Sequence, residues 1–352
     1  MKVLILYTEL AGYVVSCINA AAEDPRISEI HVVRYPVNNE APFVFNFHQN
    51  VKIYDRKEFS SSELLGLAEN IKPEIILCSG WIDKDYLKIC KSFKKSSQTV
   101  LTMDNHWEGS MKQYLLKFIS HCTIHKCFTH AWVPGKPQKE YALKLGFKLN
   151  KIQEGVYVTD TNRFTEIFEA NKMNDSFPKV LICVARYIPA KGLEVLWEAF
   201  RKLKDGNKSD WQLWCVGHGS GFENRKEYDG ICHLGFVQPK DLQGIMKDAG
   251  VFVLPSLFEP WGVVVQEFAS AGFPLLLSDK VGSGSRFLKN EENGYSFKAN
   301  DVNDLYHALI EVTSLTDVEY KTMAAKSNEI AANLTIKNWV ETLVSIRLNG
   351  PV

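Results

Sequence analysis

The sequence lacks features that would place it in several other classes of protein. No stretch approaches the roughly 20 consecutive apolar residues that a membrane-spanning helix requires. Lysine plus arginine and aspartate plus glutamate both total 41, so the chain as a whole has no excess of positive charge that would indicate nucleic-acid binding. No C-x-x-C pair and no complete G-x-G-x-x-G motif is present, so the sequence indicates neither a zinc ribbon nor a standard dinucleotide site.

A disulfide framework is also not expected, although the chain has eight cysteines. Several of them lie inside apolar, strand-like runs such as Ile182-Cys183-Val184, where free buried thiols in a reducing compartment explain them better. At the N-terminus, Lys2 precedes an apolar run, but Glu9 interrupts it and its length is that of a strand rather than a secretion signal. We therefore expect a cytoplasmic protein.

The pattern of the chain predicts two α/β domains. Its 352 residues are 45% hydrophobic and 23% charged, which is ordinary for a soluble globular protein. Buried-strand patterns alternate with helical ones in both halves, which is typical of doubly wound parallel sheets. We predict an N-terminal domain over 1–165, a C-terminal domain over 166–334, and a helix in 335–352 that packs back on the N-terminal domain. A polar linker is expected over 166–177, and one long amphipathic helix over 111–128.

The most informative stretch is 251–279, which reads as strand, loop, helix and strand. An apolar run at 251–254 precedes a loop at 256–262, a helix over 263–272 and a second buried strand at 274–277. Such a βαβ unit belongs to a parallel sheet, and open α/β sheets bind ligands at the carboxyl ends of their strands. Glu259 in the loop and Glu267 in the helix have apolar neighbours, although carboxylates are rarely buried without a partner.

Three motifs in the C-terminal half together resemble the retaining glycosyltransferases of family 4. They are Arg186 and Lys191 in A-R-Y-I-P-A-K-G-L, the Gly217-containing segment V-G-H-G, and the pair Glu259-x7-Glu267. The resemblance implies the GT-B fold, in which two Rossmann-like domains face each other across a central cleft. The N-terminal half resembles the family only in its strand-turn-helix start and in the order of its elements, as expected of the domain that holds the acceptor.

The resemblance also implies roles for the residues of a nucleotide-sugar donor site. Arg186 and Lys191 would contact the donor diphosphate, whose negative charge grows as the sugar leaves, so cations there stabilise the transition state. Glu267 would accept hydrogen bonds from the ribose hydroxyls, and Glu259 would bind the transferred sugar. The remaining donor-binding positions are Gly12, Gly217 and the backbone amides of Gly262, Val263 and Val264, which open a helix.

The N-terminal half offers fewer candidates. The family often presents a His-Asp pair at the end of the strand that here ends in Thr102-Met103-Asp104. Asp104 matches the aspartate, but Met103 stands where the histidine would be. His106 could substitute for it, and an ordinary polar loop histidine fits the sequence equally well.

The function implied by the resemblance is hexosyl transfer. The enzyme would move a sugar from a nucleotide-sugar donor, most simply UDP- or GDP-linked, to a glycan or lipid-linked acceptor and form an α-glycosidic bond with retention. Polysaccharide or lipopolysaccharide biosynthesis is the expected context, with no cofactor and no metal because the cations neutralise the diphosphate. Two alternatives remain: a nucleotide-sugar epimerase of the same fold, and a non-catalytic nucleotide-sugar-binding scaffold.

One region has a strong local charge. Between Lys84 and Lys148 the chain has twelve lysines and four acidic residues, so the local balance is 12 − 4 = +8. Solvated helix faces explain this pattern somewhat better, and the alternative is peripheral docking on an anionic surface at the inner face of the cell membrane. A cluster of His121, Cys122, His125, Cys127 and His130 could suggest zinc, but ordinary helix residues are the preferred interpretation.

Overall fold

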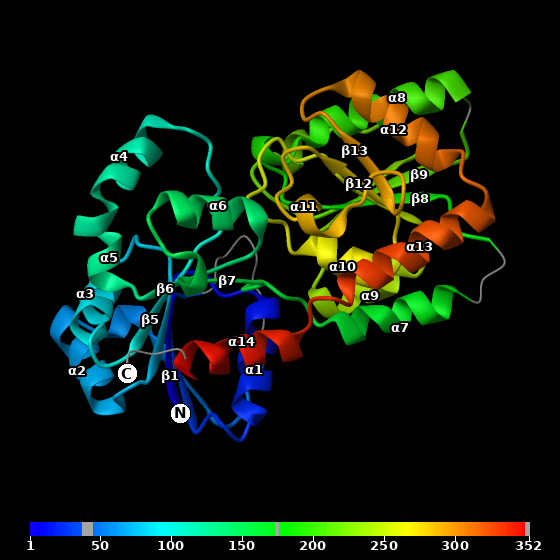
Figure 1. The fold of residues 1–352 in the computed structure, drawn as a ribbon. Helices are drawn as coiled ribbons and strands as arrows, with labels where there is room; N and C mark the ends of the chain where they lie inside the picture. The colour runs from blue at the N-terminus through cyan, green and yellow to red at the C-terminus, as the bar shows by residue number, and fades with distance from the viewer. Residues whose placement is uncertain (37–44, 173–175, 208, 349–352) are drawn as a thin grey trace. The chain divides into compact units, whose positions relative to one another are not determined.

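The computed structural model describes residues 1–36, 45–172, 176–207 and 209–348. The chain forms two compact units (Figure 1). The N-terminal unit consists of Met1–Thr159 and Leu334–Val352, and the C-terminal unit consists of Asp160–Asn333. Among the described residues no helix is both long enough and apolar enough to span a membrane.

The N-terminal unit is built on a parallel sheet of seven strands in the order β3-β2-β1-β4-β5-β6-β7. Its elements are β1 (Lys2–Tyr7), α1 (Gly12–Glu23), β2 (Glu29–Arg34), β3 (Val51–Asp55), η1 (Arg56–Glu58), α2 (Ser61–Ile71), β4 (Ile75–Ser79), α3 (Lys84–Phe93), β5 (Gln98–Thr102), α4 (Met111–Ile119), η2 (Ser120–Cys122), α5 (Ile124–Cys127), β6 (His130–Val133), α6 (Lys136–Lys144), η3 (Leu149–Lys151), β7 (Ile152–Glu154) and α14 (Ile336–Leu348).

The C-terminal unit is built on a parallel sheet of six strands in the order β10-β9-β8-β11-β12-β13. Its elements are α7 (Thr161–Asn171), β8 (Val180–Val184), η4 (Pro189–Lys191), α8 (Leu193–Asn207), β9 (Gln212–Val216), η5 (Phe222–Asn224), β10 (Ile231–Gly235), α9 (Pro239–Met246), β11 (Val251–Leu254), α10 (Val264–Ser270), β12 (Leu275–Ser278), α11 (Gly284–Phe287), β13 (Gly294–Phe297), α12 (Val302–Thr313) and α13 (Asp317–Ala331).

Both sheets are covered on their two faces. Successive residues of a strand point to opposite faces, yet every residue of β11 is buried, and so are the five residues that end β1. This explains why these strands are continuous apolar runs rather than alternating ones. In each unit, the hydrophobic core therefore lies on both faces of the sheet, between the strands and the helices that cover them.

The two sheets share one topology. In each, the strand order reverses at one position, between β1 and β4 in the N-terminal unit and between β8 and β11 in the C-terminal unit. The connections leave such a pair of strands in opposite directions, which opens a crevice at their carboxyl ends where ligands bind in open α/β sheets. We therefore expect ligand binding at one or both of these positions.

The long helix predicted over 111–128 is wrong. The structure has α4, a 3-10 turn and the short helix α5 in its place. At the break, Ser120 Oγ donates to the Lys117 carbonyl at 2.9 Å and Thr123 Oγ1 donates to the Ile119 carbonyl at 3.0 Å. Short polar side chains that bond the nearby backbone compete with helix continuation, which accounts for the break.

The polar linker predicted over 166–177 is also wrong, because α7 occupies its first part. Asp160 caps this helix by accepting a hydrogen bond from the Arg163 amide, and Phe164 and Ile167 are buried at helical spacing. We predicted the boundary between the domains at 165/166, inside α7, whereas the structure divides the chain before this helix.

The last helix, α14, belongs to the N-terminal unit. Its Trp339 side chain is buried, packs against Trp132 of β6 with ring centroids 4.9 Å apart, and donates from Nε1 to the Val156 carbonyl at 3.0 Å. Arg26 reaches the same helix and pairs with Glu341 at 2.7 Å. Helix α14 therefore packs on the N-terminal unit, to which Met1–Thr159 also belong.

Candidate functional site

Two loops meet at the carboxyl ends of β8 and β11. The amides of Leu257 and Phe258, after β11, both donate to the carbonyl of Ala190, after β8, at 2.8 and 3.1 Å. Gly192 makes this approach possible, because a Cβ at that position would lie only 2.3 Å from the Pro255 carbonyl oxygen. The loops that carry the predicted cations and the first glutamate are thus tied together by their backbones.

An ion pair joins these loops at the level of the side chains. Lys191 Nζ donates to Glu259 Oε2, and the two side chains are only 15% and 13% exposed. Each charge compensates the desolvation of the other, because burying a single ion is costly. The motifs predict that Lys191 and Glu259 bind one ligand, but they contain no signal that the two side chains pair with each other.

Arg186 lies in the same loop and has an exposed side chain. The neighbouring loop after β9 supports this segment through glycines. Gly217 has φ +139° and would place a Cβ 2.0 Å from the Ala185 carbonyl oxygen, so only glycine fits there. The Tyr187 amide also donates to the His218 carbonyl at 3.0 Å. The structure therefore places Gly217 as a packing partner of the segment that carries Arg186.

Gly262 shapes the start of α10. It has φ +88°, and a Cβ there would lie 3.0 Å from Cγ of Glu259, so the glutamate side chain folds over this glycine. Val263 is the N-cap of α10, Val264 is its first residue, and Glu267 lies in its first turn. Four predicted donor-site residues thus follow Glu259 within one loop and one helical turn.

The small-residue loop at 282–285 forms hydrogen bonds with the backbone of the loop that carries Glu259 and Gly262. The Gly282 amide donates to the Glu259 carbonyl at 3.0 Å, and the Ser283 amide donates to the Trp261 carbonyl at 2.9 Å. Ser283 Oγ also donates to the Gly262 carbonyl at 3.0 Å, and its side chain is fully buried. In the sequence, this segment resembles the small-residue loop of the family, which either approaches the donor or is a plain connection. Its support of the Glu259 loop has no signal there, because the contacts are to backbone atoms.

Asp104 lies in the N-terminal unit, directly after β5 and the buried Met103. Its carbonyl accepts a hydrogen bond from Gln138 Nε2 at 3.0 Å. Burial raises the pKa of Tyr7, and the nearby Asp104 carboxylate raises it further; burial and neighbouring Tyr7 raise the pKa of Tyr157. Both phenols therefore remain protonated hydrogen-bond donors beside Asp104 at neutral pH.

His106 and Gly12 also lie in the N-terminal unit. The carbonyl of His106 accepts from Gln113 Nε2 at 2.7 Å, and its ring Nε2 lies 3.9 Å from Glu108. Gly12 is the first residue of α1, where an added Cβ would meet no described atom within 4 Å. The other donor-site residues all belong to the C-terminal unit, so neither Gly12 nor Asp104 shares their loops.

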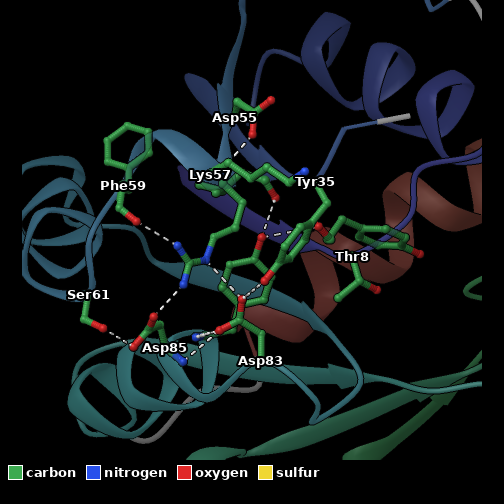
Figure 2. A network of polar contacts seen from close by, with 12 residues as sticks. Thr8, Tyr35, Asp55, Lys57, Phe59, Ser61, Asp83 and Asp85 are labelled. Atoms are coloured by element: carbon green, nitrogen blue, oxygen red, sulfur yellow. Dashed lines mark hydrogen bonds and ion pairs between the residues drawn. The ribbon is translucent and has the colours of Figure 1, made fainter. Parts of the chain in front are cut away.

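A polar network occupies the strand ends of the N-terminal unit (Figure 2). Asp83 accepts hydrogen bonds from the Tyr35 hydroxyl at 2.8 Å and from Arg56 Nε at 3.0 Å, while Arg56 Nη2 pairs with Asp85 at 2.5 Å. Burial alone would raise the pKa of Asp83, but hydrogen bonds from Tyr35 and from the start of α3 lower it overall. The charges of this network satisfy one another, and Asp83 also caps α3.

The histidine and cysteine cluster of the N-terminal half has a structural explanation. His125 Nε2 lies 2.9 Å from the Leu145 carbonyl oxygen, and its ring stacks on that of His121 at 4.9 Å. His130 is fully buried on β6, where burial and the nearby Lys151 lower its pKa to about 4. Within the described ranges no group of three or more histidine, cysteine, aspartate or glutamate side chains could hold a metal ion.

Comparison with known proteins assigns a family model to most of the C-terminal unit. Residues 164–329 match the model of the glycosyl transferases group 1. An uncharacterized glycosyltransferase of Methanocaldococcus jannaschii is 32% identical over 126 residues, which cover 33% of this chain and 31% of that protein. The UDP-Gal:alpha-D-GlcNAc-diphosphoundecaprenol alpha-1,3-galactosyltransferase of Escherichia coli is 36% identical over 73 residues, or 21% of this chain and 19% of that protein. The matched regions thus span a third or less of these relatives.

Solved structures match the whole chain. Sucrose-phosphate synthase of Thermosynechococcus elongatus superposes with a TM-score of 0.73 at 16% identity and covers 98% of both chains. The Anabaena protein HepE in complex with UDP and glucose gives a TM-score of 0.72 at 14% identity, with 99% of both chains covered. At these identities the likeness establishes the fold, and the two doubly wound sheets confirm the predicted GT-B architecture.

Proposed function

We propose that the protein is a retaining glycosyltransferase that moves a hexose-type sugar from a nucleotide-sugar donor to a glycan or lipid-linked acceptor and forms an α-glycosidic bond. The observation that carries the proposal is the convergence of Lys191, Glu259 and Gly262 at the topological switch point of the C-terminal sheet. This switch point lies inside the segment that matches the group 1 family model. Similarity of fold alone would not suffice, because one fold supports many functions.

The proposed chemistry follows from the charges in these loops. The donor diphosphate would be bound by Arg186 and by the backbone amides of Gly262, Val263 and Val264, with Gly217 shaping the wall beside Arg186. Lys191, now paired with Glu259, would turn to the phosphate as negative charge develops there. Glu259 would then hold hydroxyls of the transferred sugar, and Glu267 those of the ribose. The two cations neutralise the diphosphate, so the proposed reaction requires no metal ion and no cofactor.

In the proposed step, the bond between the anomeric carbon and the phosphate oxygen breaks as the acceptor hydroxyl bonds to the same face of the sugar. The acceptor proton passes to the departing phosphate oxygen, which balances the reaction without an enzyme nucleophile. Asp104 and Gly12 would act from the N-terminal unit, Asp104 toward the acceptor and Gly12 toward the donor. His106 remains a second candidate on the acceptor side.

Two relatives support the choice of substrates to test. The E. coli relative is named for a UDP-galactose donor and a diphosphoundecaprenol-linked acceptor, and HepE was solved with UDP and glucose. We therefore propose UDP-hexoses first and GDP-hexoses second, with a lipid-linked or polysaccharide acceptor in polysaccharide or lipopolysaccharide biosynthesis. The eight free cysteines and the basic region between Lys84 and Lys148 support a cytoplasmic protein that is peripheral to the inner face of the membrane.

A donor panel tests this proposal. Thermal unfolding would be followed with UDP-, GDP-, ADP- and dTDP-sugars, because a ligand that binds only the folded state raises the midpoint. The donor that gives the largest shift would then be incubated without acceptor. Slow release of free sugar supports a glycosyltransferase, release of a new nucleotide sugar would indicate the epimerase alternative, and binding without any turnover would indicate the scaffold. The anomeric configuration of the product, read by NMR, tests retention.

A further inference from the structure

Helix α4 exposes its apolar side chains to solvent. Met111, Leu115 and Phe118 are 85%, 62% and 87% exposed, and Tyr114 is 54% exposed. None of the nine described residues of α4 is buried, and Figure 1 shows the helix standing out from the body of the N-terminal unit. Scattered exposed apolar residues are normal, but a contiguous group on one element indicates an interaction surface.

The exposed residues form one face. Met111, Tyr114, Leu115 and Phe118 follow the spacing i, i+3, i+4 and i+7, which places them on a single stripe of a helix. A capping box fixes the start of this helix, with Ser110 accepting from the Gln113 amide and the Gln113 side chain accepting from the Ser110 amide. The stripe is therefore held on a formed helix, although the core of the unit does not use it.

Positive charge borders this stripe. Lys112 and Lys117 are exposed on α4 itself, and Lys144 of α6 lies 5.1 Å above the ring of Trp107, which in turn contacts Tyr114 with centroids 4.9 Å apart. Between residues 105 and 128 the chain has three lysines and one acid, Glu108. An apolar stripe with cations at its sides matches the boundary of an anionic lipid surface, where side chains enter the acyl region and ammonium groups meet phosphates.

The same helix is fastened to the loop that carries Asp104. Gln113 donates to the His106 carbonyl at 2.7 Å and accepts from the Glu108 amide at 2.8 Å. The Trp107 ring lies between Tyr114 and Tyr141 of α6, with centroids 4.9 and 5.6 Å away. A surface that binds α4 would thus lie next to the loop proposed to meet the acceptor.

We infer that α4 docks the protein on an anionic lipid surface by inserting Met111, Leu115 and Phe118 while Lys112, Lys117 and Lys144 contact lipid phosphates. The role of this contact in presenting a lipid-linked acceptor to Asp104 rests on the proposed function, whereas the lipid binding itself does not. A negatively charged bilayer is favoured over a second copy of the chain because the stripe has cations on its borders and because the chain as a whole is neutral.

Co-sedimentation of the full chain with vesicles tests the inference. We expect binding to vesicles of phosphatidylcholine with phosphatidylglycerol at low salt, at least about tenfold weaker binding to phosphatidylcholine alone, and weakening by salt. The combined change Met111→Ser, Leu115→Ser and Phe118→Ser should lower the partition coefficient by at least about tenfold, because each side chain loses its apolar transfer. The combined change Lys112→Glu and Lys117→Glu should lower it by a similar factor.

Val318→Ser is the matched control, because Val318 is 75% exposed on α13 of the C-terminal unit and should not affect vesicle binding. Circular dichroism and the thermal midpoint would show that the α4 variants are folded, as expected for exposed positions. Donor hydrolysis without acceptor should be unchanged in these variants, so loss of lipid binding and failure of the proposed enzymatic function give different results.

Three results would overturn the inference. The first is no binding of the wild-type protein to anionic vesicles at low salt. The second is equal binding of the wild type and of the serine variant, which would leave the lysines alone as the cause. The third is an oligomer in light scattering that the serine variant converts to a monomer without any change in vesicle binding, which would make the stripe an interface between copies of the chain.

Discussion

The two units have the same sheet order up to the sixth strand but differ in the charged residues that follow their strands. In the C-terminal unit, the strand ends carry the exposed Arg186 and the Lys191–Glu259 pair in loops shaped by glycines. In the N-terminal unit, a polar network follows three strands: Tyr35 lies after β2, Arg56 after β3 and Asp83 in the loop after β4. They are paired with one another and with the start of α3 (Figure 2).

This difference shows how similar frameworks are put to different uses. Charges that satisfy one another within the unit, as around Arg56, stabilise loop geometry and offer little to a ligand. In contrast, Lys191 has a single carboxylate partner that a bound sugar can also engage, so the pair can be divided between phosphate and sugar. We therefore interpret the C-terminal switch point as the donor site and the network around Arg56 as a scaffold. Asp104, the proposed acceptor-side residue, lies after β5, outside that network.

The largest expected effect comes from Lys191→Ala. Removing a cation that is positioned for the developing phosphate charge should lower both transfer and acceptor-free hydrolysis by about 10² to 10³-fold. Steady-state assays with the donor chosen by thermal shift would measure it, with Lys247→Ala, an exposed lysine after α9, as the control. Activity within threefold of the wild type would remove Lys191 from the site.

Asp104→Asn tests whether the N-terminal unit acts on the acceptor. The substitution keeps the shape of the side chain but removes its charge, and we expect transfer to fall by about 10²-fold because the acceptor hydroxyl is then poorly oriented. Acceptor-free hydrolysis should fall far less, and the ratio of the two rates is the measurement. Equal losses in both rates would place Asp104 in the donor site instead, and Glu140→Gln on α6 serves as the surface control.

His130 should make the N-terminal unit sensitive to acid. Its folded pKa of about 4 lies below the ordinary 6.5, so the unfolded chain binds a proton between these values when the native protein does not. Stability is therefore lost as pH falls through this window, by about 2 kcal/mol between pH 6.5 and pH 5 for a fully buried group. Urea unfolding of the wild type and His130→Gln at pH 7 and pH 5 would measure the difference, and an identical pH dependence would contradict it.

The smallest effect on activity is expected from a substitution in the small-residue loop at 282–285. Ser283→Ala removes the hydrogen bond from Oγ to the Gly262 carbonyl and should raise KM for the donor about fivefold, with a smaller change in kcat. Ser285→Ala is the matched control, because the exposed Ser285 bonds only its own loop at the Gly282 carbonyl. Equal effects of the two substitutions would show that Ser283 does not position the loop.

Much of the fold could be predicted because the buried strands are continuous apolar runs such as 251–254 and 180–184. Two segments were predicted wrongly, and the reasons lie in their local sequence. Apolar residues from Tyr114 to Ile119 suggested a longer helix, whereas the break depends on hydrogen bonds of Ser120 and Thr123 that the hydrophobic pattern does not reveal. The polar composition of α7 concealed a buried stripe of Phe164 and Ile167.

The candidate site was predictable in part. Arg186, Lys191 and Glu259 are candidates because their motifs resemble those of a glycosyltransferase family, and the structure brings Lys191 and Glu259 into contact. That contact does not follow from the motifs, since the approach of the loops depends on backbone hydrogen bonds to Ala190 and on the buried Ser283. Exposure of the α4 stripe was likewise invisible in the sequence, where its apolar residues are typical of a core-facing helix.

Calorimetric titration of the protein with UDP and GDP tests most directly whether the C-terminal switch point is the nucleotide site. We predict one site for one of these nucleotides, about 10 to 100-fold weaker binding in Glu267→Ala because two ribose hydrogen bonds to a carboxylate are lost, and unchanged binding in Glu311→Ala on α12. If neither nucleoside diphosphate binds, or if Glu267→Ala keeps the wild-type affinity, the nucleotide site does not lie at the C-terminal switch point.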